Sequence, residues 1–213
     1  MEHCKRKVAS EFFNTIGGKR SFSPLGFWPT HSRSLFAVLP MNIVTPRLRL
    51  RLWQDADRVA FAAMNADPEV MADLGGPLDV SESDAKFDRY AAALHERSFG
   101  RWLVETHDGN FVGYTGVLKA HRPNHPLGEH FEIGWRLIRT AWGKGYATEA
   151  AKAALEDAFT RVRLQEVLAY TAPENARSRA VMERLALKRD PSRDFTAQYD
   201  KGVWRGLVWY ARP

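Results

Sequence analysis

The sequence predicts a mixed domain of the α+β or α/β class, with helices packed around a mixed sheet. Three observations support this class. The chain of 213 residues is 45% hydrophobic and 26% charged, which is typical of one globular domain with a substantial core. Segments that alternate polar and apolar residues are interleaved with segments of helical period. Their order is strand, helices, a three-strand meander, helix, strand, helix and strand, which favours helices on a mixed sheet.

The first half of this order begins with a strand. "RLRLRLW" (47–53) alternates arginine with apolar residues, so we expect one buried face and one solvated face formed by the arginines. A helix capped by Asp55 should follow, and "GGP" (75–77) should end that region. A second helix is expected over 81–99, with Ser81 as its cap. Helical spacing predicts the following inward-facing residues: Val59, Ala62, Ala63 and Ala66, then Ala85, Tyr90, Ala93 and Leu94.

The second half begins with a hairpin over 101–120, in which "DGN" is the turn. A strand over 131–138 should be interrupted by Gly134. An alanine-rich helix is expected from about Tyr146, followed by a buried strand over 166–172. A helix capped by Asn175 and one aromatic-rich strand complete the chain. We expect that last strand to form core or a dimer surface.

The positive charge is concentrated at the N-terminus. The net charge is +6, and residues 1–40 carry a surplus of four positive charges, so 41–213 carry a surplus of only two. Residues 1–40 also show no sustained period, whereas Met41 opens the regular segment "MNIVTPRLRLRLW". We therefore expect residues 1–40 to be an extension outside the core fold and 41–213 to be the domain. Met41 is then a genuine or alternative initiator.

These patterns argue against several classes of protein. The balanced charge of 41–213 removes the basic surface that general phosphate-backbone binding needs, which leaves only the N-terminal arm for nucleic acid. No apolar run approaches the roughly 18 residues of a membrane span. The single cysteine, Cys4, cannot form an internal disulfide. We therefore expect a cytoplasmic protein, monomeric or homodimeric, with no membrane partner; an organelle transit peptide stays open for the extension.

The stretch "AWGKGYATEA" (141–150) indicates an anion site. A strand, a glycine-containing turn and a helix N-terminus follow one another here, and the N–H groups of a first helical turn lack partners within the helix. Gly143 and Gly145 allow close approach to the backbone, and Lys144 adds a positive charge. The ligand expected from this pattern is a phosphate or pyrophosphate. The alternative, on spacing alone, is a helix start whose glycines merely form a turn.

Several segments together resemble one known family. "EIGWRLIRTAWGKGYATEA" (132–150) and "PENARSRAVMERLAL" (173–187) resemble the GNAT N-acetyltransferase superfamily, whose acyl-CoA loop aligns with 142–147. Tryptophan at the first loop position, "TPRLRLRLW" and "NADPEVM" (65–71) are similar to its RimJ/RimL-like branch of ribosomal-protein N-terminal acetyltransferases. Ala186 departs from the family pattern, in which glycine is usual.

The resemblance implies a V-splayed mixed sheet with acetyl-CoA lodged between the strands 131–138 and 166–172. The pyrophosphate is implied to lie on the loop backbone, and the pantetheine arm to pair with the backbone of 137–138 as an added strand does. Asn175 and Ser178 are implied to face the thiol end of the cofactor. The implied cofactor-binding residues are Leu137, Ile138, Trp142, Gly143, Lys144, Gly145, Tyr146, Ala147, Asn175 and Ser178.

The chemistry needs a neutral amine, a stabilised oxyanion and a proton for the leaving thiolate. A backbone N–H near 133–137, where the sheet splays, could stabilise the oxyanion. Glu132 is the candidate base, through a water; the alternative is a carboxylate on a wet face shared with His130 and Arg136. Ser178 is the candidate acid for the thiolate; the alternative is a polar residue of a first helical turn.

The predicted function is transfer of an acetyl group from acetyl-CoA to a primary amine within a ternary complex. The first acceptor to consider is a protein N-terminal α-amine, and the second is a small amine such as a polyamine, amino acid or aminoglycoside. The loops 71–84 and 121–130 should set this choice. A non-catalytic acyl-CoA sensor is the alternative from another class. His121, His125 and His130 share one loop, but their spacing lacks the tight pairing of zinc sites, so no metal is expected.

Overall fold

The computed structural model describes residues 42–120, 125–199 and 202–213. The predicted extension over 1–40, Met41 and His121 lie outside the described residues, so the predicted domain boundary stays a prediction. Within the described ranges, no helix combines the length and the apolar character needed to cross a bilayer.

The described strands form one mixed sheet around which the helices are arranged. Its strand order is β1-β2-β3-β4-β5-β6-β9-β7. The remaining strand, β8, pairs with residues 202–206 of β9. Neighbouring strands are antiparallel except for β5 and β6, which are parallel. The strands are β1 (Asn42–Val44), β2 (Leu48–Arg51), β3 (Arg101–Thr106), β4 (Phe111–Ala120), β5 (His130–Leu137), β6 (Val167–Thr171), β7 (Lys188–Arg189), β8 (Phe195–Tyr199) and β9 (Gly202–Ala211).

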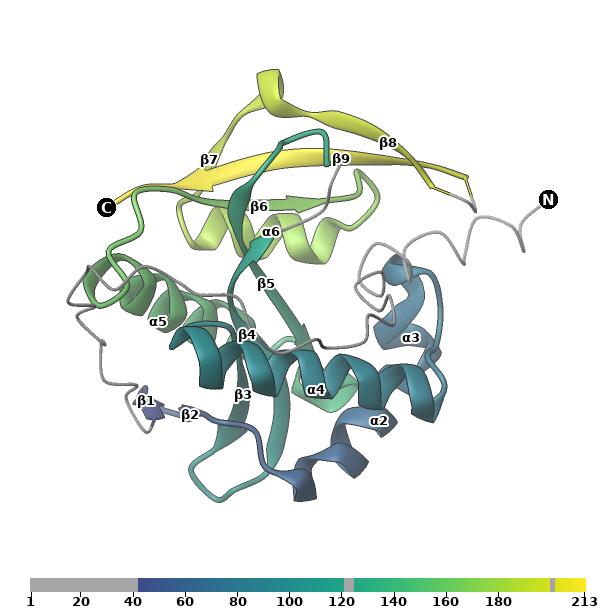
Figure 1. The fold of residues 1–213 in the computed structure, drawn as a ribbon, viewed down its shortest axis with the longest axis vertical. Helices are drawn as coiled ribbons and strands as arrows, with labels where there is room; N and C mark the ends of the chain where they lie inside the picture. Colours follow the sequence, from purple (N-terminus) through teal and green to yellow (C-terminus); the bar gives the residue numbers. More distant parts are fainter. Residues whose placement is uncertain (1–41, 121–124, 200–201) are drawn as a thin grey trace, which may run out of the picture.

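Figure 1 shows β1 to β4 with α2 and α4 in the lower part of the molecule, and β6 to β9 with α6 in the upper part. β5 runs between the two parts, and α5 lies beside it. The α-helices are α2 (Arg58–Ala66), α3 (Pro68–Met71), α4 (Val80–Arg97), α5 (Tyr146–Thr160) and α6 (Ala176–Arg184). The short 3-10 helices are η1 (Asp55–Asp57), η2 (Ala72–Leu74), η3 (Arg139–Ala141) and η4 (Pro191–Arg193).

The sheet splays between β5 and β6. The two strands are in register at a single pair, Glu132 opposite Leu168, and separate beyond it. β5 itself is continuous, since all eight of its residues pair one-to-one with β4. The predicted interruption at Gly134 is therefore wrong. Gly134 instead leaves room for a side chain, because a Cβ there would lie 2.8 Å from Nη2 of Arg101.

The two faces of β5 are covered by different groups of helices. Ile133 and Leu137 belong to the main core with the alanine face of α5, on which residues 150, 151, 154, 155 and 158 are buried. On the opposite face, Tyr114 of β4 packs with Phe61, Phe87 and Tyr90 of α2 and α4 in a second, aromatic core. Alternation along the strands thus separates the two faces.

The N-terminal helices differ from the prediction in phase and caps. In α2 the buried residues are Phe61, Met64 and Asn65, whereas the predicted Val59 is 81% exposed. The prediction followed the helical spacing of small alanines. The larger side chains of Phe61 and Met64 instead determine which face packs, because they bury more apolar area. α4 starts after Asp79, whose carboxylate accepts from Glu82 N at 2.8 Å while the Glu82 carboxylate accepts from Asp79 N. This reciprocal cap replaces the predicted cap at Ser81.

Candidate active site

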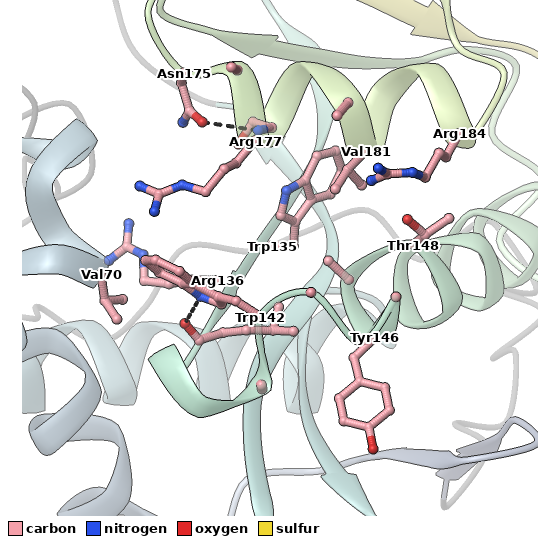
Figure 2. Close-up of a pocket in the computed structure, with 18 of the residues that line it drawn as sticks. Val70, Trp135, Arg136, Trp142, Tyr146, Thr148, Asn175, Arg177, Val181 and Arg184 are labelled. Carbon is pink, nitrogen blue, oxygen red and sulfur yellow. Dashed lines mark hydrogen bonds between the residues drawn. The ribbon is translucent and has the colours of Figure 1, made fainter.

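A cavity of about 640 Å³ lies between β5, the turn before α5, and α6. Eight of the ten predicted cofactor residues line it: Leu137, Trp142, Gly143, Gly145, Tyr146, Ala147, Asn175 and Ser178. Ile138, Lys144 and Glu132 are not among its lining residues. Figure 2 shows Trp135, Trp142 and Val181 around this space, with Asn175 at one end and Tyr146 at the other.

The glycine turn gives this cavity an exposed helix N-terminus. Gly143 (φ 74°) and Gly145 (φ 77°) both have left-handed backbones, which glycine adopts at little cost. Gly145 is the N-cap of α5 and its carbonyl accepts from Glu149 N at 3.0 Å. The N–H groups of residues 146–148 have no acceptor within the helix, and the helix dipole adds positive potential there. Ala147 and Thr148 line the cavity at this point.

The backbone of 137–138 is already engaged with the protein. Trp142 Nε1 donates to the Leu137 carbonyl at 3.0 Å, Ala141 N donates to the Ile138 carbonyl at 3.0 Å, and Ile138 N donates to Val112 O at 3.0 Å. Each carbonyl oxygen has a second lone pair. A ligand that pairs with 137–138 as an added strand does could therefore donate a hydrogen bond to either of these carbonyl oxygens.

Arginines dominate the charged lining of the cavity. Arg136, Arg177 and Arg184 line it together with one acid, Asp73. The Arg177 guanidinium lies 4.1 Å from the Trp142 ring centroid and forms a 3.3 Å pair with Asp73. Asn175 Oδ1 accepts from Ser178 N at 3.0 Å, so the predicted N-cap of α6 is confirmed. The surplus of positive charge suits an anionic ligand.

Glu132 lies on the opposite face of β5 from the alanine face of α5, where its carboxylate is enclosed. The side chain is only 13% exposed, and Oε1 pairs with Nη2 of Arg101 at 2.7 Å. The Tyr170 hydroxyl donates to Oε2. The alternative of a wet face shared by Glu132, His130 and Arg136 does not hold for Arg136, which is buried against Asn65 of α2 and Met71 of α3. Glu132 and Tyr170 stand where the strands separate.

A further group of buried polar residues lies deeper on this face. Lys86 of α4 is fully buried, and its Nζ lies 3.4 Å from Oδ1 of Asn65, which also accepts from Arg136 at 3.2 Å. Burial, and then the positive charges of Arg136 and other arginines, lower the pKa of Lys86 well below its usual value. This face therefore buries basic side chains, and those of Lys86 and Arg136 lie against the ring of Tyr114.

His125 of the loop before β5 and His130, the first residue of β5, contact aromatic rings. The ring centroids of His125 and His130 are 4.7 Å apart, and both rings lie 5.6 Å from Tyr170. Within 42–120, 125–199 and 202–213, no three His, Cys, Asp or Glu side chains gather in a way that could hold a metal ion. His121 lies outside these ranges.

Sequence reasoning missed several residues of the site. Arg101 and Tyr170 reach Glu132 from segments 31 and 38 residues away, and no local pattern marks either of them. Arg177 and Arg184 are seven residues apart on α6, a spacing that places both on one helical face, so this pair could have been found. Arg47, predicted to be simply solvated, instead contacts the glycine turn.

The comparisons with known proteins agree with one another. The family model described as "Acetyltransferase (GNAT) domain" matches residues 47–188. An uncharacterized N-acetyltransferase of Bacillus subtilis, YnaD, is 28% identical over 171 residues, covering 80% of this chain and 92% of that protein. The FsC-acetyl coenzyme A-N(2)-transacetylase of Aspergillus fumigatus is 30% identical over 176 residues, covering 78% of this chain and 74% of that protein. The crystal structure of an acetyltransferase from Agrobacterium tumefaciens superposes with a TM-score of 0.67 at 27% identity, covering 92% of this chain and all of that one.

Proposed function

Because the chain belongs to the GNAT family of acetyltransferases and is an enzyme that transfers acetyl groups, we propose that its acceptor is a protein N-terminal α-amine and that it acts within the RimJ/RimL-like branch. The branch is supported by "TPRLRLRLW", "NADPEVM" and the tryptophan at position 142. Acetyl-CoA is the acetyl donor of the family.

The residues of the cavity fit such a donor. Its diphosphate is accommodated by the left-handed turn at Gly143 and Gly145 and by the first-turn N–H groups of α5, where Cβ atoms do not obstruct the backbone. Arg177 and Arg184 add charge at the α6 side. Asn175 and Ser178 lie at the start of α6 for the thiol end. The volume of about 640 Å³ is within the range of ligand pockets of this kind.

The reaction assigns each proton a destination. The amine nitrogen attacks the thioester carbon, the new C–N bond replaces the C–S bond, and the proton lost from nitrogen passes to Glu132 through the Tyr170 hydroxyl or a water. Ser178 donates a proton to the leaving thiolate and recovers one from solvent. Backbone N–H groups at the splayed edge of β5 stabilise the oxyanion.

One observation carries the choice of an α-amine: both oxygens of the Glu132 carboxylate are already engaged, one by Arg101 and one by Tyr170. With both oxygens already accepting hydrogen bonds, this carboxylate has fewer lone pairs left for a further proton. An α-amine with a pKa of about 7.7–8.0 is roughly a tenth neutral at pH 7, whereas a lysine amine near 10.4 is neutral in well under a thousandth of molecules. The acceptor that needs the least help from a base therefore suits this site best.

A small-molecule amine is the second candidate. It is favoured by the similarity to the Aspergillus fumigatus enzyme, whose name specifies transfer to a nitrogen of the compound FsC. For this acceptor the same base and donor site apply, and only the acceptor side differs.

A panel of amines, assayed by release of the free thiol of CoA, tests the proposal. The panel contains peptides with a free N-terminus, the same peptides with a blocked N-terminus and an internal lysine, spermidine, single amino acids and an aminoglycoside. We expect the free-N-terminus peptides to have the highest kcat/KM. Faster turnover of spermidine, an amino acid or the aminoglycoside than of every such peptide would reject the N-terminal acceptor. Binding of acetyl-CoA without turnover of any amine would favour a sensor.

A further inference from the structure

A contact between two segments about a hundred residues apart holds the outer side of the glycine turn. Arg47 lies between β1 and β2, and its Nη1 donates to the carbonyl oxygen of Lys144 at 2.9 Å. The same guanidinium donates through Nε to Glu149 Oε2 at 2.6 Å, and Arg47 N donates to Glu149 Oε1 at 2.9 Å. One side chain thus bonds both the turn and the first turn of α5.

Neighbouring groups fix this arrangement. Thr45 Oγ1 donates to Glu149 Oε1 at 2.7 Å and accepts from Leu48 N at 3.0 Å. The Arg47 guanidinium lies 4.9 Å from the ring centroid of Tyr146. Figure 2 shows the Tyr146 ring directed away from the cavity. The contacts of Arg47 are therefore made on the side of the turn that the cavity does not use.

The bond to Lys144 determines the direction of a neighbouring N–H group. A trans peptide is planar, and its C=O and N–H bonds point in opposite directions. Since Arg47 holds the Lys144 oxygen on the outer side, the N–H of Gly145 in the same peptide points to the other side. Gly145 lines the cavity. This N–H is therefore directed toward the space that receives the diphosphate in the proposed function.

Glu149 creates an electrostatic problem at the same place. It is the acid in the first turn of α5. Partial burial raises the pKa of Glu149, but hydrogen bonds from Thr45 and Arg47 outweigh burial and lower that pKa below its usual value. The carboxylate is thus ionised at neutral pH, at a helix N-terminus that has to accept an anion. Pairing with Arg47 offsets its negative charge.

We propose that Arg47 is a positioning residue for the acetyl donor: it orients the Lys144–Gly145 peptide toward the cavity and offsets the Glu149 charge beside the diphosphate. This inference rests on the proposed binding of acetyl-CoA at the glycine turn. It assigns a role in the donor site to a residue of the β1–β2 segment.

Calorimetry on the full chain tests the inference with two probes, CoA and pantetheine, which lacks the diphosphate. Arg47→Ala should raise the Kd of CoA about tenfold or more and leave that of pantetheine unchanged. Arg49→Ala is the matched control, since Arg49 lies on β2 and also pairs with a glutamate, Glu105 at 3.1 Å, away from the turn; it should leave both values unchanged. The double variant Arg47→Ala/Glu149→Gln should recover part of the lost affinity for CoA, because the unpaired carboxylate is then gone.

The outcomes separate the inference from the function on which it rests. A wild-type protein that does not bind CoA overturns the proposed donor site and this inference with it. A wild-type protein that binds CoA, with Arg47→Ala binding it equally well, overturns the inference alone. Equal losses for CoA and pantetheine overturn it too, because they would reflect a general loss of structure. A double variant that binds CoA no better than Arg47→Ala rejects the role in charge balance.

Discussion

The two faces of β5 are built in different ways. Toward α5 and α6, the site is centred on the backbone of a glycine turn and a helix N-terminus, with Trp142, Arg177 and Arg184 around them. Toward α2 and α4, it consists of buried charged groups that come from separate strands and helices: Arg101, Glu132 and Arg136, with Lys86 and Asn65. The first face relies on backbone groups and the second on side chains.

This difference has consequences for substitutions. A backbone site tolerates most side-chain changes that preserve its conformation, because its N–H groups are supplied by every residue except proline. A buried ion pair tolerates few, because removal of one partner leaves an uncompensated charge in a medium of low polarity. The face toward α2 and α4 should therefore be the more sensitive in stability, and the face toward α5 the more sensitive in binding of the donor.

The largest effect is expected at Arg101, which is 2% exposed and holds Glu132. Arg101→Met should lower the free energy of unfolding by about 3–5 kcal/mol, because Glu132 then loses its partner in a buried position. Urea unfolding measures this value. The double variant Arg101→Met/Glu132→Leu should recover much of the loss, since it removes both charges. A loss below about 1 kcal/mol for Arg101→Met would mean that the pair is not effectively buried.

A smaller effect is expected for Glu132→Gln, this time in activity. Loss of the proposed base should reduce kcat/KM by about 100-fold, the lower end of the range for general bases and equivalent to about 2.7 kcal/mol. The Kd of CoA should remain unchanged, because Glu132 does not line the cavity. Tyr170→Phe should reduce kcat/KM as well, because it removes the hydroxyl through which the amine proton is proposed to reach Glu132. Wild-type rates in Glu132→Gln would exclude it as the base.

The glycine turn can be separated from general backbone strain with two substitutions. Gly145 and Gly109 have similar left-handed backbones, φ 77° and 81°, but Gly109 is in the hairpin turn between β3 and β4. Alanine at either position should cost about 1–2 kcal/mol of stability. Only Gly145→Ala should also weaken binding of CoA, by calorimetry, because only this turn forms the donor site. Equal CoA affinities in the two variants would contradict that assignment.

The partly exposed ion pairs of Glu166, just before β6, should contribute less than the buried pair. Partial burial raises the pKa of Glu166, but hydrogen bonds from Arg193 and Arg212 outweigh it, so its pKa is lowered. A lowered pKa in the folded state gives stability that is present above the unfolded value and is lost as the pH falls through the folded one. After allowance for solvent screening, this contribution is about 0.5–1 kcal/mol.

Melting temperatures measured from pH 7 to pH 3 test this expectation. The wild type should lose stability below about pH 4.5, and Glu166→Gln should show a shallower acid limb with a melting temperature about 2–4 °C lower at pH 7. Superimposable pH curves for the two proteins would show that these exposed pairs add nothing.

The smallest effect is expected at Ala186, just after α6. Its φ of 56° is left-handed, a conformation in which glycine is favoured after a helix end. Ala186→Gly should relieve this strain but also increase the freedom of the unfolded chain, for a net gain of about 0.5 kcal/mol. Thermal unfolding measures the gain. Ala85→Gly is the control: this residue is exposed and lies in the middle of α4, so glycine there should lower the stability. Destabilisation by Ala186→Gly would contradict the strain.

Features that depend on neighbours along the chain could be predicted from the amino-acid sequence. The hairpin of β3 and β4, the alanine face of α5, the cap at Asn175 and the turn at Gly143 and Gly145 were all predicted, because turn chemistry, helical period and capping act over a few residues. The family and the class of reaction followed from the same local segments. The short strands β7 and β8 were not predicted, since their pairing with β9 depends on contacts between separate segments.

Which charges are buried, and which partners they have, depends on the packing of segments that are distant in the sequence. Glu132 and Arg47 both alternate with apolar residues along the sequence, and this period is equally consistent with a solvated face or with a second layer of protein. Arg101 of β3 and Tyr170 of β6 enclose Glu132, whereas α5 brings Glu149 and the Lys144 carbonyl to Arg47. The physical reason is that alternation specifies on which side of a strand a residue lies, whereas packing of distant segments determines what occupies that side.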